Sequence, residues 1–172
     1  MTHKIRLLFL LVMASFSAFG QAKPYKIISI KAYLYYNAES LQDPGVRGTL
    51  SENLIDNGEF ALWNTIIGEG SAKAASSQTF VVVELKGNPK EYVHRKVVLT
   101  ATARGRQVFR QSQYFSILND GKAYSAAFLL YDTGCEELKL KAEIIDEKTK
   151  GGKKQFIAES SLAKTIPFAC GE

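Results

Sequence analysis

The side chains best suited to acid–base chemistry are carboxylates in the first half of the chain. They fall within residues 38–78, where apolar and polar residues do not alternate regularly: Glu52, Asp56, Glu59 and Glu69. Two carboxylates can hydrolyse a bond as general acid and nucleophile or base, provided that a fixed distance separates them. The sequence does not set that distance. A carboxylate-dependent hydrolase is therefore one hypothesis, and dispersed surface carboxylates are the alternative.

Other catalytic arrangements are disfavoured by what the chain lacks. It has two histidines, and His94 is the one that lies beyond the N-terminal segment. There is no G-x-S-x-G motif to present a nucleophile, and the glycine-rich run 68–71 lacks the lysine of a phosphate-binding loop. Zinc and EF-hand spacings are also missing, and the acidic cluster 56–59 is more typical of a solvated turn than of a calcium site. We therefore expect no catalytic residue, no metal and no cofactor.

The first 22 residues have the features of a secretory signal peptide. A basic start at Lys4 and Arg6 precedes an apolar run, and small residues then lead to a small-x-small cleavage site at Ala22. The alternative is an uncleaved membrane anchor, but about a dozen apolar residues fall short of the ~20 that span a bilayer. We predict a secreted or periplasmic protein whose mature chain has no membrane span. Nucleic acid is not an expected partner there.

Both cysteines, Cys135 and Cys170, remain after this cleavage. An oxidising compartment favours their pairing. Closing a loop of about 36 residues stabilises a fold by roughly 3–4 kcal/mol in the chain-entropy account. The chain has no C-x-x-C spacing, which disfavours a redox-active pair. We therefore predict a structural disulfide rather than two free thiols.

Alternation with a period of two predicts the elements that position these side chains. Seven such segments, separated by turns and not by helices, indicate one antiparallel β-sandwich domain over residues 23–172. They cover residues 25–37, 79–85, 93–103, 107–118, 124–131, 137–146 and 156–169. In the first segment, Ile28 is expected to share a buried face with Ile30, and residues 147–154 are expected to form a solvated loop. The turn before Tyr124 resembles the tyrosine corner of immunoglobulin-like sandwiches, which implies a fold type and no function.

The insertion, residues 38–78, is too long for an ordinary connection between strands. Phe60, Trp63 and Ile67 have the i, i+3, i+7 spacing of one helical face, so a helical turn or two is predicted within residues 57–68. Trp63 is the only tryptophan of the chain. It is either a plug that closes one end of the sandwich or an anchor for a partner, because tryptophan is favoured at binding hot spots.

Charge is distributed unevenly along the chain, which has a formal charge of +5. The signal peptide holds two of the 22 basic residues and none of the 17 acidic ones, so its removal leaves +3. The insertion has six acidic and two basic residues, or −4, whereas residues 86–110 have seven basic and one acidic, or +6. Either the two stretches neutralise each other within the fold, or one of them meets a charged partner.

These features favour a non-catalytic protein that presents the insertion to a protein or to a component of the cell envelope. The candidate contact residues come from both charged stretches: Phe60, Trp63, Asp56, Glu59, Glu69, Arg95, Arg104 and Arg106. Two other hypotheses remain. A carrier of an apolar ligand requires an apolar cavity, and a small hydrolase requires two of the carboxylates to converge in a cleft.

Overall fold

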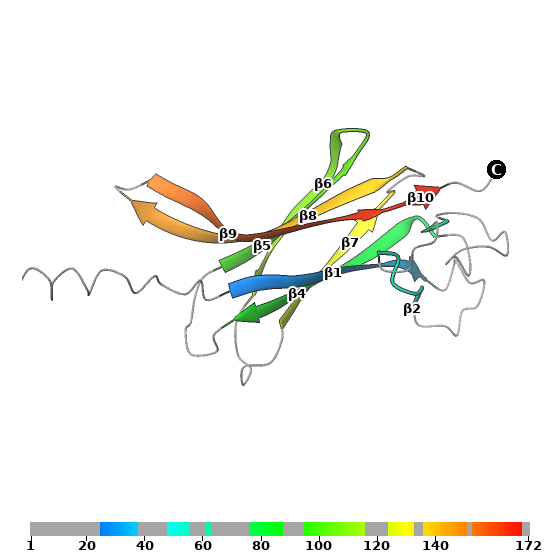
Figure 1. Cartoon of the computed structure of the whole chain (residues 1–172), viewed down its shortest axis with the longest axis horizontal. Coiled ribbons are helices and arrows are strands. Elements are labelled where there is room, and N and C mark those ends of the chain that lie inside the picture. The colour runs from blue at the N-terminus through cyan, green and yellow to red at the C-terminus, as the bar shows by residue number, and fades with distance from the viewer. Residues whose placement is uncertain are drawn as a thin grey trace, which may run out of the picture.

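The computed structural model shows an all-β protein (Figure 1). It describes residues 25–37, 48–55, 61–62, 76–87, 95–115, 124–132, 136–150 and 153–169. The long strands there are β1 (Tyr25–Tyr36), β4 (Gln78–Gly87), β5 (Arg95–Ala103), β6 (Arg106–Phe115), β7 (Tyr124–Tyr131), β8 (Leu138–Lys150) and β9 (Lys153–Ile166). Three strands have two residues each: β2 (Thr49–Leu50), β3 (Ala61–Leu62) and β10 (Phe168–Ala169). Within this part of the chain, no helix is long and apolar enough to cross a membrane.

The strands form two four-stranded antiparallel sheets that lie as two layers (Figure 1). The first sheet has the order β2-β1-β4-β7, and the second has the order β6-β5-β8-β9. A two-stranded parallel pair joins β3 to β10. The prediction of an antiparallel all-β protein is thus confirmed.

One hydrophobic cluster fills the space between the layers. The first sheet contributes alternate residues of its central strand, such as Val81 and Val83, and the second contributes Leu140 and Ile144 in the same way. All four are completely or almost completely buried. Burial of each such side chain is worth roughly 1.5–3 kcal/mol. Both sheets therefore share one hydrophobic core.

Strand β1 changes its buried face at a β-bulge. Ile27 and Ile30 are both buried, so the buried positions change from odd to even numbers along the strand. The pairing with β4 skips one residue between Ile27 and Ser29. Ile28 is the extra residue, and it is 44% exposed. The prediction that Ile28 shares a face with Ile30 is therefore wrong, because one inserted residue reverses the alternation.

The layers are also joined by hydrogen bonds along both open sides. On one side, the backbone N–H of Ile27 in β1 donates to the Ser160 hydroxyl of β9 at 3.2 Å. On the other, the side-chain amide of Gln113 in β6 donates to the Ala127 carbonyl in β7. Edge strands present unpaired backbone groups, and these two bonds use some of them.

Two further sequence expectations need correction. Residues 147–154 were expected to be a loop, but β8 continues to Lys150 and β9 begins at Lys153, so these strands make a hairpin arm that extends beyond the second sheet (Figure 1). A helical turn was expected within residues 57–68. Ala61–Leu62 is instead strand β3, which pairs with β10, and the remainder of that range lies outside the described residues. Partner strands supply backbone hydrogen bonds that local sequence patterns do not reveal.

A buried ion pair lies at the base of the arm. Arg95 is 5% exposed, and its Nε and Nη2 donate to the two carboxylate oxygens of Glu159 at 2.6 and 2.8 Å. Its guanidinium also stacks over the Tyr25 ring, 4.6 Å from the centroid. Glu159 is the residue that the β8–β9 pairing skips, since Ile144 is opposite Ser160 and Ile145 is opposite Ala158. This second bulge places its carboxylate within reach of Arg95.

We predict that Arg95→Met or Glu159→Gln alone lowers the free energy of unfolding by about 3–5 kcal/mol, because each substitution leaves a buried polar or charged partner unpaired. The double variant Arg95→Met/Glu159→Leu should cost much less, since neither charge remains. Urea unfolding followed by circular dichroism measures both.

Lys139→Met is the matched control, because Lys139 pairs with Glu137 at 3.5 Å on the surface. That change should fall within about 0.5 kcal/mol of the wild type. Equal losses for the single variants and the control would show that the Arg95–Glu159 pair contributes no more than a surface pair.

Candidate functional site

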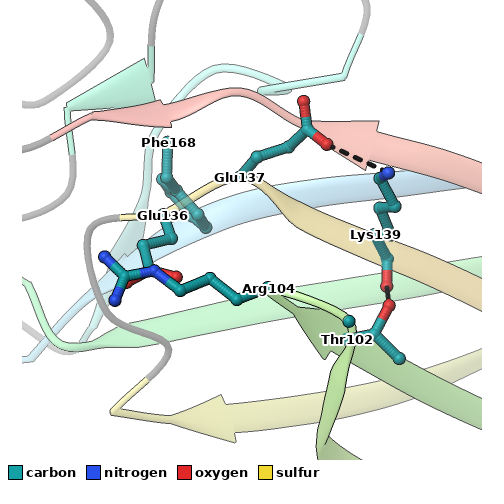
Figure 2. A pocket seen from close by; sticks show the side chains of 7 residues that line it. Thr102, Arg104, Glu136, Glu137, Lys139 and Phe168 are labelled. Carbon is teal, nitrogen blue, oxygen red and sulfur yellow. Dashed lines mark hydrogen bonds and ion pairs between the residues drawn. The ribbon is translucent and has the colours of Figure 1, made fainter.

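The candidate site is a pocket of about 420 Å³ at the end of the sandwich where three segments meet (Figure 2). These segments are the β5–β6 turn, the start of β8 and strand β10. The lining residues are Thr102, Arg104, Gly105, Glu136, Glu137, Lys139 and Phe168. Most of them are polar or charged, and the Phe168 ring supplies an apolar wall.

The β5–β6 turn positions the first cation of the pocket. Arg104 and Gly105 both have positive φ angles, 47° and 73°, as expected of a two-residue hairpin turn that matches the twist of its strands. Glycine adopts this conformation without strain, whereas Arg104 does so at a cost of about 1–2 kcal/mol. Its guanidinium reaches across to the Glu136 carboxylate (Figure 2). The turn therefore contributes one ion pair to the lining of the pocket.

A second ion pair lies beside the first. The Lys139 ammonium is 3.5 Å from the Glu137 carboxylate, and the Thr102 hydroxyl donates to the Lys139 carbonyl at 3.5 Å (Figure 2). Each cation of the pocket thus has a carboxylate partner, and the lining is close to neutral. Such a surface suits a polar or zwitterionic group better than the apolar ligand of the carrier hypothesis.

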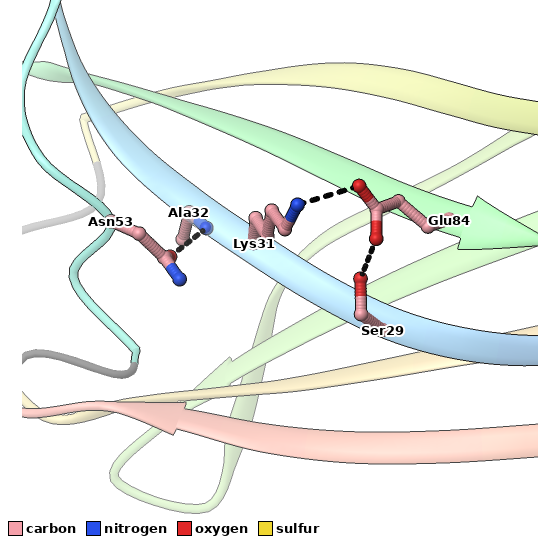
Figure 3. A network of polar contacts seen from close by, with 5 residues as sticks. All are labelled: Ser29, Lys31, Ala32, Asn53 and Glu84. Atoms are coloured by element: carbon pink, nitrogen blue, oxygen red, sulfur yellow. Dashed lines mark hydrogen bonds and ion pairs between the residues drawn. The ribbon is translucent and has the colours of Figure 1, made fainter.

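The insertion is attached to this end of the sandwich at several points. Residues 51–54 run along the free edge of β1 and replace a partner strand there. The Ser51 N–H donates to Leu34 O at 3.0 Å, the Leu54 N–H donates to Ala32 O at 2.8 Å, and the Asn53 side-chain oxygen accepts the Ala32 N–H at 3.0 Å (Figure 3). The buried Leu54 side chain also belongs to the core.

Two more attachments fix the course of the insertion. Gly48 has a φ of +38°, a conformation that glycine adopts without strain, and a Cβ there would also displace the Tyr35 phenol. The Ser76 hydroxyl donates to Tyr35 O at 2.5 Å. In the middle of the insertion, β3 pairs with β10, the strand whose Phe168 lines the pocket. The described parts of the insertion are therefore held by the sandwich.

The candidate contact residues of the insertion all lie outside the described residues: Phe60, Trp63, Asp56, Glu59 and Glu69. In the sequence, Phe60 and Trp63 directly flank β3. Glu52 is the described carboxylate among the four proposed for hydrolysis. It is exposed, and its backbone carbonyl accepts a hydrogen bond from Ser51.

The three candidate arginines do not form one patch. Arg104 lines the pocket, and Arg106 is exposed at the start of β6. Arg95 is buried at the opposite end of β5, about 30 Å away for an extended strand. Arg95 and Arg104 pair with Glu159 and Glu136, which both lie outside the insertion.

Sequence reasoning missed Glu136, Glu137, Lys139 and Phe168. They come from segments about 30 residues apart, which the antiparallel pairing of β8 with β9 brings together, beginning at Leu138 opposite Ile166. The sequence had one signal for this meeting, namely the predicted bond between Cys135 and Cys170. Both cysteines lie outside the described residues, but each is within two positions of a pocket residue.

A hydrogen-bonded ion pair lies on the outer surface of the first sheet. The Lys31 ammonium donates to one Glu84 oxygen at 2.7 Å, and the Ser29 hydroxyl donates to the other at 2.5 Å (Figure 3). The bond from Lys31 is the main reason why the pKa of Glu84 lies below its usual value, and the bond from Ser29 adds to it. Partial burial acts in the opposite direction and does not outweigh them.

The chain matches no protein-family model and no curated protein. Within the described residues, no group of three or more histidine, cysteine or acidic side chains is arranged to hold a metal ion. Any function for this end of the sandwich therefore has to be argued from its geometry and charges.

We predict that Lys31→Met raises the pKa of Glu84 toward the ordinary glutamate value, because its strongest hydrogen-bond donor is removed. The pKa of Glu84 is lowered in the folded state, so its carboxylate stabilises the fold at neutral pH, and this contribution is lost as the pH falls through the lowered pKa. Titration of the Glu84 carboxyl carbon by NMR measures the shift. Lys139→Met should leave the Glu84 midpoint unchanged, and a Lys31→Met midpoint equal to that of the wild type would contradict the assignment.

Proposed function

We propose that the protein is a non-catalytic binding module that acts after export and presents the insertion to a protein or envelope partner. The attachment of the insertion to the sandwich carries this proposal. Residues 48–55, strand β3 and Ser76 are all held by bonds to β1 or β10. Binding residues in many proteins lie on loops that a rigid scaffold positions. The segments between these three attachments are connections of this kind in the sequence.

The proposed fold type is an immunoglobulin-like sandwich. If the seven long strands are taken in chain order as A, B, C, C′, E, F and G, the first sheet has the order A-B-E and the second C′-C-F-G. That division of strands between the sheets is the one found in immunoglobulin-like domains. In variable domains of this type the recognition loops are B–C, C′–C″ and F–G, at one end of the sandwich. The insertion is the A–B connection, at the other end, so its proposed role rests on its attachment to the sandwich and not on this analogy.

Export and the disulfide belong to the same proposal. Residues 1–22 support export through their sequence features alone. For the disulfide, Leu138 is opposite Ile166 at the pocket end of β8 and β9. The cysteines lie three positions before the first residue and four after the second. Each cysteine is thus close in sequence to a residue that the pairing of β8 with β9 brings to the same end of the sandwich, which supports the proposed bond.

Capture experiments test the binding role of Trp63. The tagged protein should recover a specific partner from the exported fraction of its host, and Trp63→Ala should lose it, because truncation of a tryptophan hot spot typically costs at least about 2 kcal/mol. Tyr114→Ala is the control, since Tyr114 is an aromatic residue on β6 that is 64% exposed and lies outside the insertion. If wild-type and Trp63→Ala proteins recover the same partners in equal yield, Trp63 is not an anchor.

Peptide mapping without reduction tests the disulfide. We expect one cross-linked peptide that joins Cys135 to Cys170, and we expect Cys135→Ser/Cys170→Ser to lower the free energy of unfolding by roughly 3–4 kcal/mol. Free thiols at both positions in the exported protein would refute the pairing. Intact binding by the unlinked variant would show that the disulfide serves stability and not recognition.

A further inference from the structure

The hairpin arm projects from one end of the sandwich. Its two strands continue to pair after Asp146, the last residue of β8 that pairs with β5, and the last pair of the arm is Lys150 with Lys153. The arm therefore reaches roughly 13 Å beyond the second sheet (Figure 1). Within the described residues, no third strand pairs with this part of the hairpin.

The end of the arm is strongly basic. Residues 148–154 contain four lysines and no acidic residue: Lys148, Lys150, Lys153 and Lys154. Lys150 and Lys153 are directly opposite each other in the hairpin. Like charges in such positions repel each other and weaken the pairing of the strands. An anionic partner at the end of the arm would remove this repulsion.

Large apolar side chains follow the lysines in the same strand. Phe156 is 60% exposed and Ile157 is 45% exposed. Because these residues are adjacent in β9, they lie on opposite faces of the arm. One flat protein surface cannot cover both faces, whereas the headgroup layer of a bilayer can surround a two-stranded arm. Lysines beside exposed apolar side chains are also typical of elements that bind the surface of anionic membranes.

Further cations lie at the same end of the sandwich. Lys26 and Lys86 are exposed and directly opposite each other, one residue from the ends of β1 and β4. The described carboxylates near them are already paired with cations or are buried: Glu84, Asp146 and Glu159. Glu147 is the one other acidic residue of the arm. Positive charge is therefore in excess at this end.

The opposite end of the sandwich holds the acidic insertion. The insertion has six acidic and two basic residues, and it is bonded to the far end of β1 through Leu34 O and Tyr35 O. Strand β1 has 12 residues, so roughly 35 Å separates these attachments from the end with the arm. A molecule whose charges are divided in this way approaches an anionic surface with its basic end first.

From these observations we infer that the hairpin arm docks the protein on an anionic phospholipid surface. The lysines of the arm bind lipid phosphate groups, and Phe156 and Ile157 enter the headgroup region beside them. Each lysine close to such a surface raises the affinity about fivefold. The end that holds the insertion then faces away from the bilayer. This inference does not depend on the proposed role of Trp63, and a Trp63→Ala protein should bind the surface as the wild type does.

Co-sedimentation of the purified protein with lipid vesicles tests the docking. We expect binding to phosphatidylcholine vesicles that contain about 30% phosphatidylglycerol, and we expect none to phosphatidylcholine alone, because the attraction requires anionic headgroups. Salt at about 1 M should abolish the binding, since it shortens the Debye length to about 3 Å.

Two double variants locate the contact. Lys150→Gln/Lys153→Gln should lower the affinity for the anionic vesicles at least about tenfold. Lys141→Gln/Lys164→Gln is the matched control, because it also removes one exposed lysine from each strand of the hairpin. These two positions are about 30 Å or more from the end of the arm, so the control should change the affinity less than about threefold.

Phe156→Ser distinguishes a lipid surface from a soluble polyanion. This change should weaken vesicle binding at least about fivefold, because the ring no longer leaves water. It should leave binding to heparin unchanged, since heparin has no apolar layer to receive the ring. Tyr114→Ser is the control, because Tyr114 is an aromatic residue of the same sheet that is 64% exposed and lies outside the arm.

Each outcome decides the inference. Weakened vesicle binding by both arm variants and unchanged binding by both controls supports it, and circular dichroism checks that these surface substitutions leave the fold intact. A wild type that does not bind the anionic vesicles overturns it. Equal weakening by the two lysine double variants also overturns it, because net charge and not the arm would then control binding. A Phe156→Ser protein that binds vesicles as the wild type does overturns the lipid surface in favour of a soluble polyanion.

Discussion

The hydrogen bond from the Ile27 N–H to the Ser160 hydroxyl joins the two sheets at the point where both of its strands bend. It joins the first strand of one sheet to the last long strand of the other, and each strand has a bulge directly beside it. In β1 the bulge turns Ile28 outward, and in β9 it places Glu159 beside Arg95. A bulge bends and twists its strand, so β1 and β9 both bend at this contact. Beyond it the layers remain packed, since the Tyr25 ring of the first sheet meets the Phe115 ring of the second edge to face, and β8 and β9 continue farther as the hairpin arm.

The elements that alternation predicts best are those whose partners do not interrupt the pattern. Strand β7 was predicted over residues 124–131 and has these bounds, because every second residue packs in the core and its pairing with β4 is continuous. The face of Ile28 was missed because a bulge depends on the opposite strand, which lies more than 50 residues away. The spacing around Trp63 did not reveal strand β3 either, because this strand forms by pairing with residues beyond position 165. Local patterns therefore predict strands well and their interruptions badly.

The charges of the candidate site show the same limit. A count of charges gives residues 86–110 a strong positive excess, yet the fold places three of these cations in a buried pair, a ring contact and a pocket. Arg95 is neutralised by Glu159, Lys96 stacks on Tyr114, and Arg104 is paired with Glu136. A stretch of like charge becomes a surface patch only when its side chains share a face and lack partners. Strand geometry separates Arg95 from Arg104, and the sequence cannot reveal which acidic residue each will meet.

The two sheets of this protein therefore differ more on their outer surfaces than in their cores. Inside, both supply the same aliphatic and aromatic residues to one cluster. Outside, the second sheet is basic and rich in small hydroxyl residues, whereas the first has charged residues toward one end (Lys26, Lys31, Glu84 and Lys86) and Tyr33, Phe80 and Leu129 toward the other. On β4 the outer face is apolar at Phe80 and Val82 and polar toward both ends of the strand. Phe80 is half-buried and lies directly opposite Tyr33 and Leu129 on its two neighbouring strands, so packing among these three side chains stabilises the first sheet from its outer side.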